Sequence, residues 1–413
     1  MLNRLRSYIP SNDLWSKTIS FSIILLFIFT ADAILSYWVP VYLENVYKNT
    51  LKVGYIISVS SVIGLLSDLI FPQILKGITV KKLVLFSAVT SLFFSSSLFA
   101  TTWTPVILVF LFAMGVWGVY FELIKFAEQQ FVSDTVPLRF HSSGWGVIVV
   151  FRSISYFIGP IIAGSLMENI RYPVIIALFL EILAIILIHY FRSAHERPLK
   201  FEIKKVNLMS EFEHWGVLVK HVWPIVLLST LMGFIDAAFW TLGPIVSEKS
   251  SMGGHLLGGA LVSVYMLPSI FMGLIVSKLK IFKGKKRLAI SLFLLAGIFL
   301  SLLTSVSNYQ LQLLLVFIMS VLLSSAYPLS DAVYSDIVSR MGRERQHLIG
   351  LSSSTFSLAY IFAPTLAGFG ANYFSEIKTL GIIGYFCVFF GFFLLFFTPN
   401  KLKVPQKTIQ KWK

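Results

Sequence analysis

The chain has 413 residues, of which 56% are hydrophobic and only 13% are charged, and its mean hydropathy is +0.81. Soluble globular proteins carry about 25% charged residues, so this composition excludes that class and indicates a membrane protein. The net charge is +15, and the single cysteine, Cys387, allows neither an internal disulfide nor a cysteine-based metal site.

Uninterrupted apolar runs predict twelve transmembrane spans. About 20 residues are needed to cross the hydrocarbon as a helix, and lipid satisfies no backbone polar group, so we expect every run to be helical. In chain order the first six runs are 19–42, 53–75, 82–101, 104–125, 144–167 and 172–192. The second six are 222–246, 256–277, 286–305, 310–330, 350–372 and 378–398. The first run is too long for a cleaved signal peptide.

Lysine and arginine are concentrated in some of the predicted loops and absent from others. The loop after the second run holds Lys76, Lys81 and Lys82, whereas segments 101–104 and 305–308 carry no charge. Positive residues in short loops stay on the cytoplasmic side, so we expect both termini to be cytoplasmic in a multi-pass protein of the cytoplasmic or plasma membrane. We interpret the excess positive charge as this topology signal and as a complement to anionic lipid, and expect no nucleic-acid partner.

The sequence contains an internal repeat at an offset of 204 residues. Asp32-Ala33 corresponds to Asp236-Ala237 at this offset. Further matches pair Pro40 with Pro244, Glu44 with Glu248, Lys81 with Lys285, Pro160 with Pro364, and Gly164 with Gly368. Six spans per repeat give parallel repeats, so we predict a six-helix bundle at 1–195, a cytoplasmic linker at 196–219 and a second six-helix bundle at 220–413.

Two local motifs accompany the repeat. The segment from Gly64 to Asp68 ends the second span, and Gly159-Pro160 with Gly164 lies in the fifth span and is echoed by Pro364 and Gly368 in the eleventh. A proline removes a backbone donor and kinks a helix, while glycines allow close helix approach. The alternative for these residues is a simple packing kink.

With twelve spans in two halves and these motifs, nearly the whole chain resembles the major facilitator superfamily. The segment around Pro160 is similar to an element of the proton-driven exporters in that family. The loop after Asp68 departs from the family pattern, with Leu69, Phe71 and Pro72 at positions that usually hold Arg, Gly and a basic residue. The resemblance implies an all-α membrane protein of two six-helix bundles that acts as a monomer, with spans 1, 4, 7 and 10 lining a central cavity.

Asp32 and Asp236 each lie about 14 residues into their spans, near the membrane midplane. An ionised side chain there costs about 2.5–3.5 kcal/mol, so such residues face a cavity or a partner. Burial disfavours the charged form of a carboxyl, so these groups are candidates to take up and release protons. The alternative is a hydrogen bond that only locks the bundle.

Other charged residues cluster near the ends of the spans. Glu122, Lys125 and Glu128 recur at helical spacing, and with Arg152 they suggest a four-member network that is either a gate or substrate contact or a packing cluster. Asp331 and Asp336 precede Arg340, Arg343 and Arg345, and we expect them to pair across an inner gate. The resemblance would place Asp68 against the amino end of the eleventh span.

Aromatic and polar side chains near the two acids are candidates to line the cavity. They are Ser36, Trp117, Tyr120, Met232, Trp240 and Tyr327. Acids together with aromatic rings suit an amphipathic or cationic substrate. The alternative is that these rings contact lipid, because aromatic residues also anchor helices in membranes.

Taken together, these features predict a secondary transporter that works by alternating access and exports amphipathic or cationic small molecules in exchange for protons. Proton-coupled uptake of a small organic solute is the alternative, and a non-transporting membrane sensor is a more remote one. We expect no enzyme activity, no catalytic or metal site and no cofactor, because the spans contain no nucleophile or metal constellation and no phosphate-binding loop.

Overall fold

The computed structural model describes residues 12–75, 78–136, 141–191, 208–250, 259–278, 284–338, 341 and 345–402. Within these ranges the chain is helical, without a strand. Eleven of the described helices are long and apolar enough to cross a membrane, and Ala260–Val276 forms a shorter apolar segment. The all-helical membrane architecture expected from the sequence is therefore confirmed.

Six of the described helices form the N-terminal half. They are α2 (Asn12–Tyr47), α3 (Thr50–Ile74), α4 (Val80–Thr101), α5 (Ile107–Thr135), α6 (His141–Ser165) and α7 (Tyr172–Tyr190). Polar residues mark two of their starts, because the side chain of Asn49 accepts from the backbone N–H of Lys52 and that of Thr79 accepts from Lys82. The bounds agree with the predicted runs within about three residues at most ends, but α2 is longer at both ends and α5 continues well beyond the predicted end at residue 125.

In the part of the chain that the structure describes, seven α-helices form the C-terminal half. They are α8 (Leu208–Ser250), α9 (Ala260–Met266), α10 (Ser269–Lys278), α11 (Lys285–Ser301), α12 (Tyr309–Val338), α13 (Arg345–Phe374) and α14 (Glu376–Phe397). The predicted eighth span is thus two short helices rather than one, and they meet at Pro268, whose nitrogen cannot donate a helical hydrogen bond. Residues 208–219 of the predicted linker are helical and continuous with the seventh span, and residues 196–207 lie outside the described residues.

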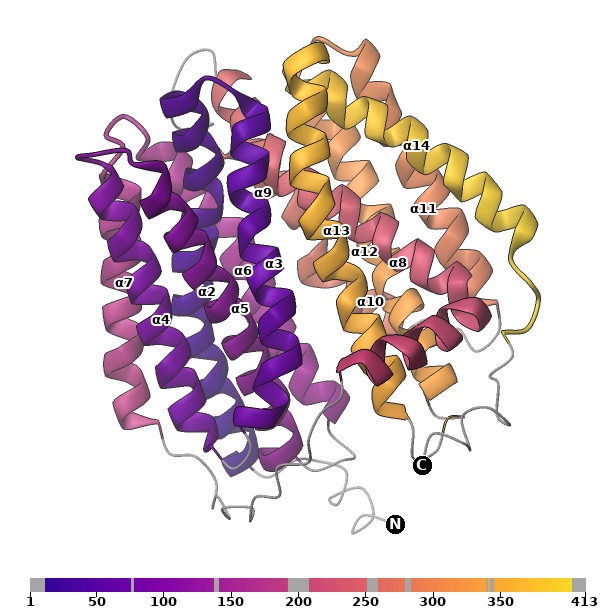
Figure 1. Ribbon diagram of the computed structural model, residues 1–413, viewed down its shortest axis with the longest axis horizontal. Coiled ribbons are helices and arrows are strands. Elements are labelled where there is room, and N and C mark those ends of the chain that lie inside the picture. The colour runs from indigo at the N-terminus through magenta and orange to yellow at the C-terminus, as the bar shows by residue number, and fades with distance from the viewer. Residues whose placement is uncertain are drawn as a thin grey trace.

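The two halves lie side by side, one drawn in indigo to magenta and the other in rose to yellow (Figure 1). Within each half neighbouring helices pack along their lengths, for example α2 on α6 and α11 on α12. Between the halves the contacts join α3 to α13, α6 to α9 and α10, and α2 to α8. Among the described residues the C-terminal half holds one apolar core and the N-terminal half holds two, one of which crosses the seam between the halves to include Val262 of α9.

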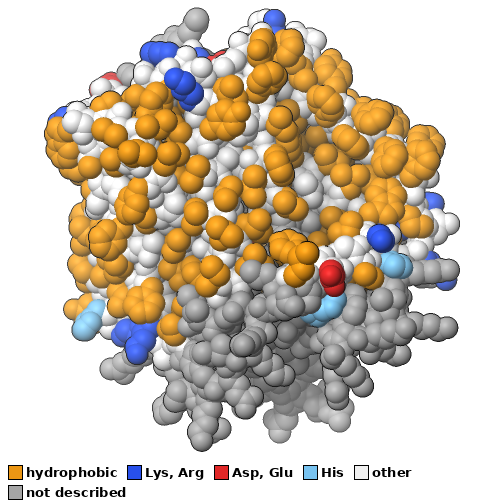
Figure 2. Space-filling model, viewed as in Figure 1, with side chains coloured by type: hydrophobic (Ala, Val, Ile, Leu, Met, Phe, Trp, Pro, Cys, Tyr) orange, Lys and Arg blue, Asp and Glu red, His pale blue; other side chains and the backbone are white. Residues whose placement is uncertain are grey.

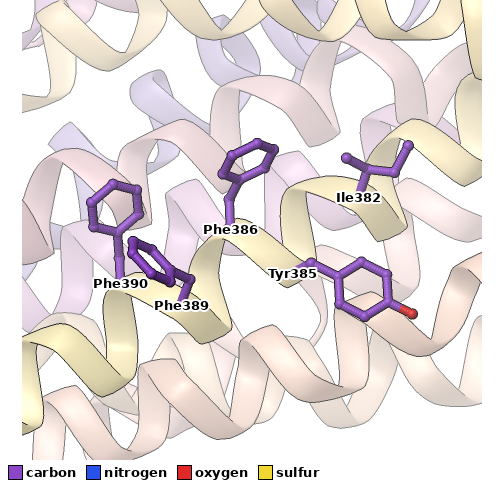
Figure 3. A pocket seen from close by; sticks show the side chains of 5 residues that line it. All are labelled: Ile382, Tyr385, Phe386, Phe389 and Phe390. Atoms are coloured by element: carbon purple, nitrogen blue, oxygen red, sulfur yellow. The ribbon is translucent and has the colours of Figure 1, made fainter.

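The outer surface carries many large apolar side chains. Phe93 and Phe179 are 63% exposed and Phe396 is 81% exposed, and orange side chains spread over most of the visible face in Figure 2. A shallow hollow on α14 is lined by Ile382, Tyr385, Phe386, Phe389 and Phe390 (Figure 3). Such a continuous apolar surface fits lipid contact, and the hollow lies on this surface rather than between the halves.

Candidate functional site

Asp32 is buried in the middle of α2, with 1% of its surface exposed. The indole Nε1 of Trp117 on α5 donates to its Oδ1 at 2.7 Å, and the hydroxyl of Tyr156 on α6 donates to its Oδ2 at 2.5 Å. Both carboxyl oxygens therefore hold one donor, and each donor comes from a different helix. A hydrogen bond to a charged group is worth about 1.5–3 kcal/mol, which offsets part of the cost of a charge inside the membrane.

Asp236 occupies the corresponding position of α8. The hydroxyl of Tyr265 on α9 donates to its Oδ1 at 2.6 Å, and the hydroxyl of Tyr360 on α13 donates to its Oδ2 at 2.5 Å. Again each oxygen holds one donor, and again three helices meet at one carboxyl. Tyr156 and Tyr360 are themselves 204 residues apart, so the acid and one of its tyrosines recur together in the repeat.

The predicted aromatic residues divide between contacts with these acids and contacts within the cores. Trp117 bonds to Asp32 and stacks on Phe94 with ring centroids 5.4 Å apart. Trp240 of the C-terminal half meets the ring of Tyr156 edge-on at 5.4 Å, so the two acid sites are joined through an aromatic contact across the seam. Tyr120 is fully buried in the core of the N-terminal half.

The remaining predicted cavity residues lie close to the two acids along the helices. Met232 precedes Asp236 by one turn, is 1% exposed, and its carbonyl accepts from the hydroxyl of Tyr327 at 3.1 Å. Ser36 follows Asp32 by one turn and is 7% exposed. Their role as substrate contacts stays a prediction, because their contacts belong as much to helix packing.

The predicted charge network is divided into two groups in the structure. The amine of Lys125 lies 3.0 Å from Glu122 and 3.6 Å from Asp68, which joins α5 to α3. Arg152 on α6 pairs separately with Glu128, whose surface is 1% exposed, and its guanidinium lies 4.9 Å from the ring centre of Phe29. Sequence spacing placed Glu122, Lys125 and Glu128 on one helix face and Arg152 at a similar depth in the next span, but it could not show which partner each charge would choose.

In the C-terminal half, Asp336 pairs with Lys285 at the start of α11, at 2.8 Å. Asp331 lies one turn before it on α12 and is exposed. The expected arginine partners, Arg340, Arg343 and the side chain of Arg345, lie outside the described residues. The carboxyl of Asp68 is held by Lys125, and its expected place at the amino end of the eleventh span stays a prediction.

The proline motifs lie at the seam between the halves. Pro160 is inside α6 and Pro364 is inside α13. The carbonyl oxygen of Pro160 faces Gly259 and that of Pro364 faces Gly54, so closely that a Cβ on either glycine would overlap the oxygen. Gly159 abuts Ala33 of α2, and Gly368 abuts the backbone of Thr50 in the same way. The glycines thus allow three pairs of helices to approach closely: α6 with α9 and α13 with α3 across the seam, and α6 with α2 within the N-terminal half.

Polar contacts close the same end of the seam, and we call them the latch. Tyr37 donates to Glu248 at 3.3 Å and accepts from the backbone N–H of Gly259 at 2.9 Å. Asn372 accepts from the backbone N–H of Thr50 at 3.1 Å, and Lys249 lies 3.9 Å from Glu44. These residues lie at the end opposite the start of α2 and the end of α14.

Sequence reasoning missed four residues of this midplane region. Three are the tyrosines Tyr156, Tyr265 and Tyr360, and the fourth is Glu181, which is fully buried in α7. The offset of 204 relates Tyr156 to Tyr360 and could have found them. The rule that marked Asp32, a charged residue in the middle of a span, applies equally to Glu181. Among the described residues no group of His, Cys, Asp and Glu could hold a metal ion.

Comparison with known sequences gives a family match and one distant relative. The family model described as Major Facilitator Superfamily matches residues 81–340 and 254–413, which is more than half of the chain. Multidrug resistance protein 2 of Bacillus subtilis (strain 168) is 25% identical over 277 residues, which is 63% of this chain. The aligned part spans 66% of that relative, just under two thirds of its length.

Solved structures share the fold at low sequence identity. A POT family transporter in complex with 5-aminolevulinic acid has a TM-score of 0.75 at 13% identity, over 93% of this chain and 96% of that one. The nucleoside transporter NupG has a TM-score of 0.73 at 11% identity, over 92% and 100%. A human organic anion transporter has a TM-score of 0.67 at 14% identity, over 93% and 100%.

Proposed function

Because the chain belongs to the Major Facilitator Superfamily, we propose that it is a secondary transporter that exports amphipathic or cationic small molecules in exchange for protons. Its family and its solved relatives are transporters and not enzymes. Its helices make it a multi-pass membrane protein, and we place it in the cytoplasmic membrane on the distribution of lysine and arginine. We further propose that one copy of the chain suffices.

The proposal rests above all on Asp32 and Asp236. Each is an acid in the middle of a span, at repeat-related positions, with its oxygens held by hydroxyl or indole donors and without a lysine or arginine partner among the described contacts. A carboxyl held by neutral donors can accept either a proton or a cation without first breaking an ion pair. Competition between the two for the same carboxyls would couple export of a cation to entry of protons.

The seam supports alternating access. The latch and the two proline–glycine contacts hold one end of the halves together by backbone approach and hydrogen bonds. Opening of this end requires these contacts to break together, while the midplane acids stay within their own halves. Rocking of the halves about the acids would then expose them to each side in turn.

The comparison with a multidrug resistance protein favours export of several compounds, at 25% identity. Aromatic rings beside the acids support an amphipathic cation as the substrate class, because a cation is attracted both to a carboxylate and to a ring face. The same pair of acids would also serve proton-coupled uptake, so direction has to be measured.

Transport into proteoliposomes separates the two modes. The purified full chain is reconstituted, and a panel of fluorescent amphipathic cations is offered with a pH gradient of either sign. In exchange, an acidic lumen drives the cation inward as protons leave, whichever way the protein is inserted. Accumulation only with an acidic exterior would establish uptake instead, and flux that ignores the gradient would refute proton coupling. Collapse of the gradient by a proton–potassium ionophore and protein-free vesicles serve as controls.

A further inference from the structure

Glu181 is a third carboxyl at the membrane midplane, and it lies away from the seam. It is the tenth of the 19 residues of α7 and is fully buried. Its neighbours are α2 and α4, the two helices on which α7 packs most. Neither the proposed exchange nor the sequence prediction uses it, yet a carboxyl at this depth carries the same cost as Asp32 if it is charged.

The hydrogen bonds of Glu181 differ from those of the two aspartates. The hydroxyls of Ser91 and Ser95 on α4 both donate to Oε1, at 2.5 and 2.7 Å. The other oxygen, Oε2, is buried and has no hydrogen-bond partner among the described residues. At Asp32 and Asp236, in contrast, each oxygen holds one donor.

This pattern is that of a carboxylic acid. In the protonated form one oxygen is a carbonyl that accepts two bonds, and the other carries the proton. A buried ionised oxygen without a donor would be far more costly than an unpaired neutral O–H group. The even distribution of donors at the two aspartates, in contrast, is that expected of carboxylates.

The charged surroundings of Glu181 also favour its neutral form. Asp32 on α2 acts on it electrostatically, whereas the buried phenol of Tyr120 on α5 is neutral. From α4 the groups that face it are the two neutral serines. The two cations on that helix, Lys81 and Lys82, lie in its first turn, where Lys81 donates to the carbonyl of His189. A negative charge on Asp32 therefore opposes a second one on Glu181.

We propose that Glu181 is a second proton-binding site of the N-terminal half, which holds a proton in this conformation under the control of the charge on Asp32. While Asp32 is ionised, repulsion keeps the proton on Oε2. When a proton or a bound cation neutralises Asp32, this repulsion is removed and Glu181 can release its proton. The meaning of this site for transport rests on the proposed proton exchange, whereas its existence does not.

Infrared spectroscopy of the full chain in lipid nanodiscs tests the proposal without any substrate. A protonated carboxyl has a C=O stretch that carboxylates lack. We expect this band at neutral pH in the parent protein and its loss in Glu181→Gln, whose amide oxygen can still accept from both serines. The matched control Glu44→Gln removes an ion-paired glutamate and should leave the band unchanged.

A second measurement keeps Glu181 itself in place. In Asp32→Asn the negative neighbour is gone, so the band should disappear at a less alkaline pH than in the parent. A parent spectrum without the band, a band that persists in Glu181→Gln, or an alkaline titration unchanged by Asp32→Asn would each overturn the proposal. If the infrared results hold while vesicle transport ignores the pH gradient, the exchange fails and the proton site remains.

Discussion

The two acid sites are built alike at their centres and differ around them. Asp32 with Tyr156 and Asp236 with Tyr360 occupy repeat-related positions and make the same hydrogen bond. The second donor differs, because it comes from Trp117 on α5 in one half and from Tyr265 on α9 in the other. What the duplication has kept is an acid and one phenol, which points to these two groups as the common requirement of both halves.

The surroundings show a second difference. Arg152 and Phe29 form a cation–π contact one turn from Tyr156. At the positions 204 residues later the chain has Phe356 and Gly233, and the Phe356 ring lies over that glycine. The surroundings of the N-terminal acid therefore include an ion pair between the partly exposed Arg152 and the buried Glu128, whereas the residues at the positions of Arg152 and Phe29 in the C-terminal half are neutral. This asymmetry suggests that the halves share the chemistry of proton exchange but do not contribute to it equally.

Asparagine in place of each acid should have the largest effect. Asp32→Asn and Asp236→Asn keep the size of the side chain and one acceptor oxygen but remove the charge and the exchangeable proton. We expect gradient-driven accumulation in vesicles to be lost in both variants, while downhill leak of a substrate can persist. If one variant accumulates substrate like the parent at every pH, the carrier role belongs to the other half alone.

Phenylalanine in place of the two repeat-related tyrosines comes next. Tyr156→Phe and Tyr360→Phe each remove one donor to a carboxylate and keep the ring, a loss of about 1.5–3 kcal/mol, which is roughly a ten- to hundredfold change in an equilibrium. We expect the pH dependence of transport to change in both variants. Tyr42→Phe, which removes a phenol hydroxyl that donates to the carbonyl of Thr101 and not to either acid, is the matched control. Unchanged pH profiles in both tyrosine variants would show that the hydroxyls serve packing only.

Much of this architecture was predictable because hydrophobicity and charge distribution follow directly from the bilayer. The spans and the repeat were predicted from apolar residues, which the lipid requires, and the two acids were found as charged residues, which the lipid normally excludes. The break at Pro268 was visible as a proline, but prolines at 160, 224, 244, 328 and 364 lie inside continuous helices. A proline alone therefore does not decide between a break and a kink.

Partner choice was the part that could not be predicted. Glu122, Lys125 and Glu128 are evenly spaced on α5. Lys125 nevertheless forms ion pairs with Glu122 and Asp68, whereas Glu128 pairs with Arg152. These pairs depend on how α3 and α6 pack against α5. The same holds for Tyr265, whose ring stacks on Phe239 of α8 and whose hydroxyl reaches Asp236 through the packing of α9 on α8.

The two proline–glycine contacts across the seam allow a further test, in which the expected effect is smaller. Gly54→Ala places a Cβ against the carbonyl of Pro364, and overpacking of this kind costs about 1–3 kcal/mol. The closed seam between α3 and α13 should therefore open more often, by a factor of about five or more. The measurement is the rate at which a thiol reagent labels Ser58→Cys, which pairs with Thr365 across this seam; the native Cys387 is only 2% exposed.

The control for this change is Gly146→Ala on α6, because a Cβ at that glycine has no neighbouring atom within 4 Å. It should label like the parent and stabilise its helix slightly, since alanine is the better helix former. Equal labelling rates in Gly54→Ala and Gly146→Ala would mean that the seam accommodates the extra methyl group and that the close approach does not hold the halves together.

The smallest effect is expected at the exposed part of the latch. Glu44 and its repeat counterpart Glu248 both reach the opposite half, but Glu44 meets Lys249, whose side chain is 54% exposed, whereas Glu248 meets the fully buried Tyr37. Exposed ion pairs are worth about 0.2–1 kcal/mol and are screened by salt. Lys249→Gln should thus raise the labelling rate of Ser58→Cys by no more than about fivefold, and the difference should vanish at high salt.

Tyr37→Phe removes the buried donor to Glu248 and the acceptor of the Gly259 N–H, so its effect should be larger and insensitive to salt. An equal or greater effect of Lys249→Gln would show that the exposed charges, and not the buried tyrosine, hold this end of the molecule closed.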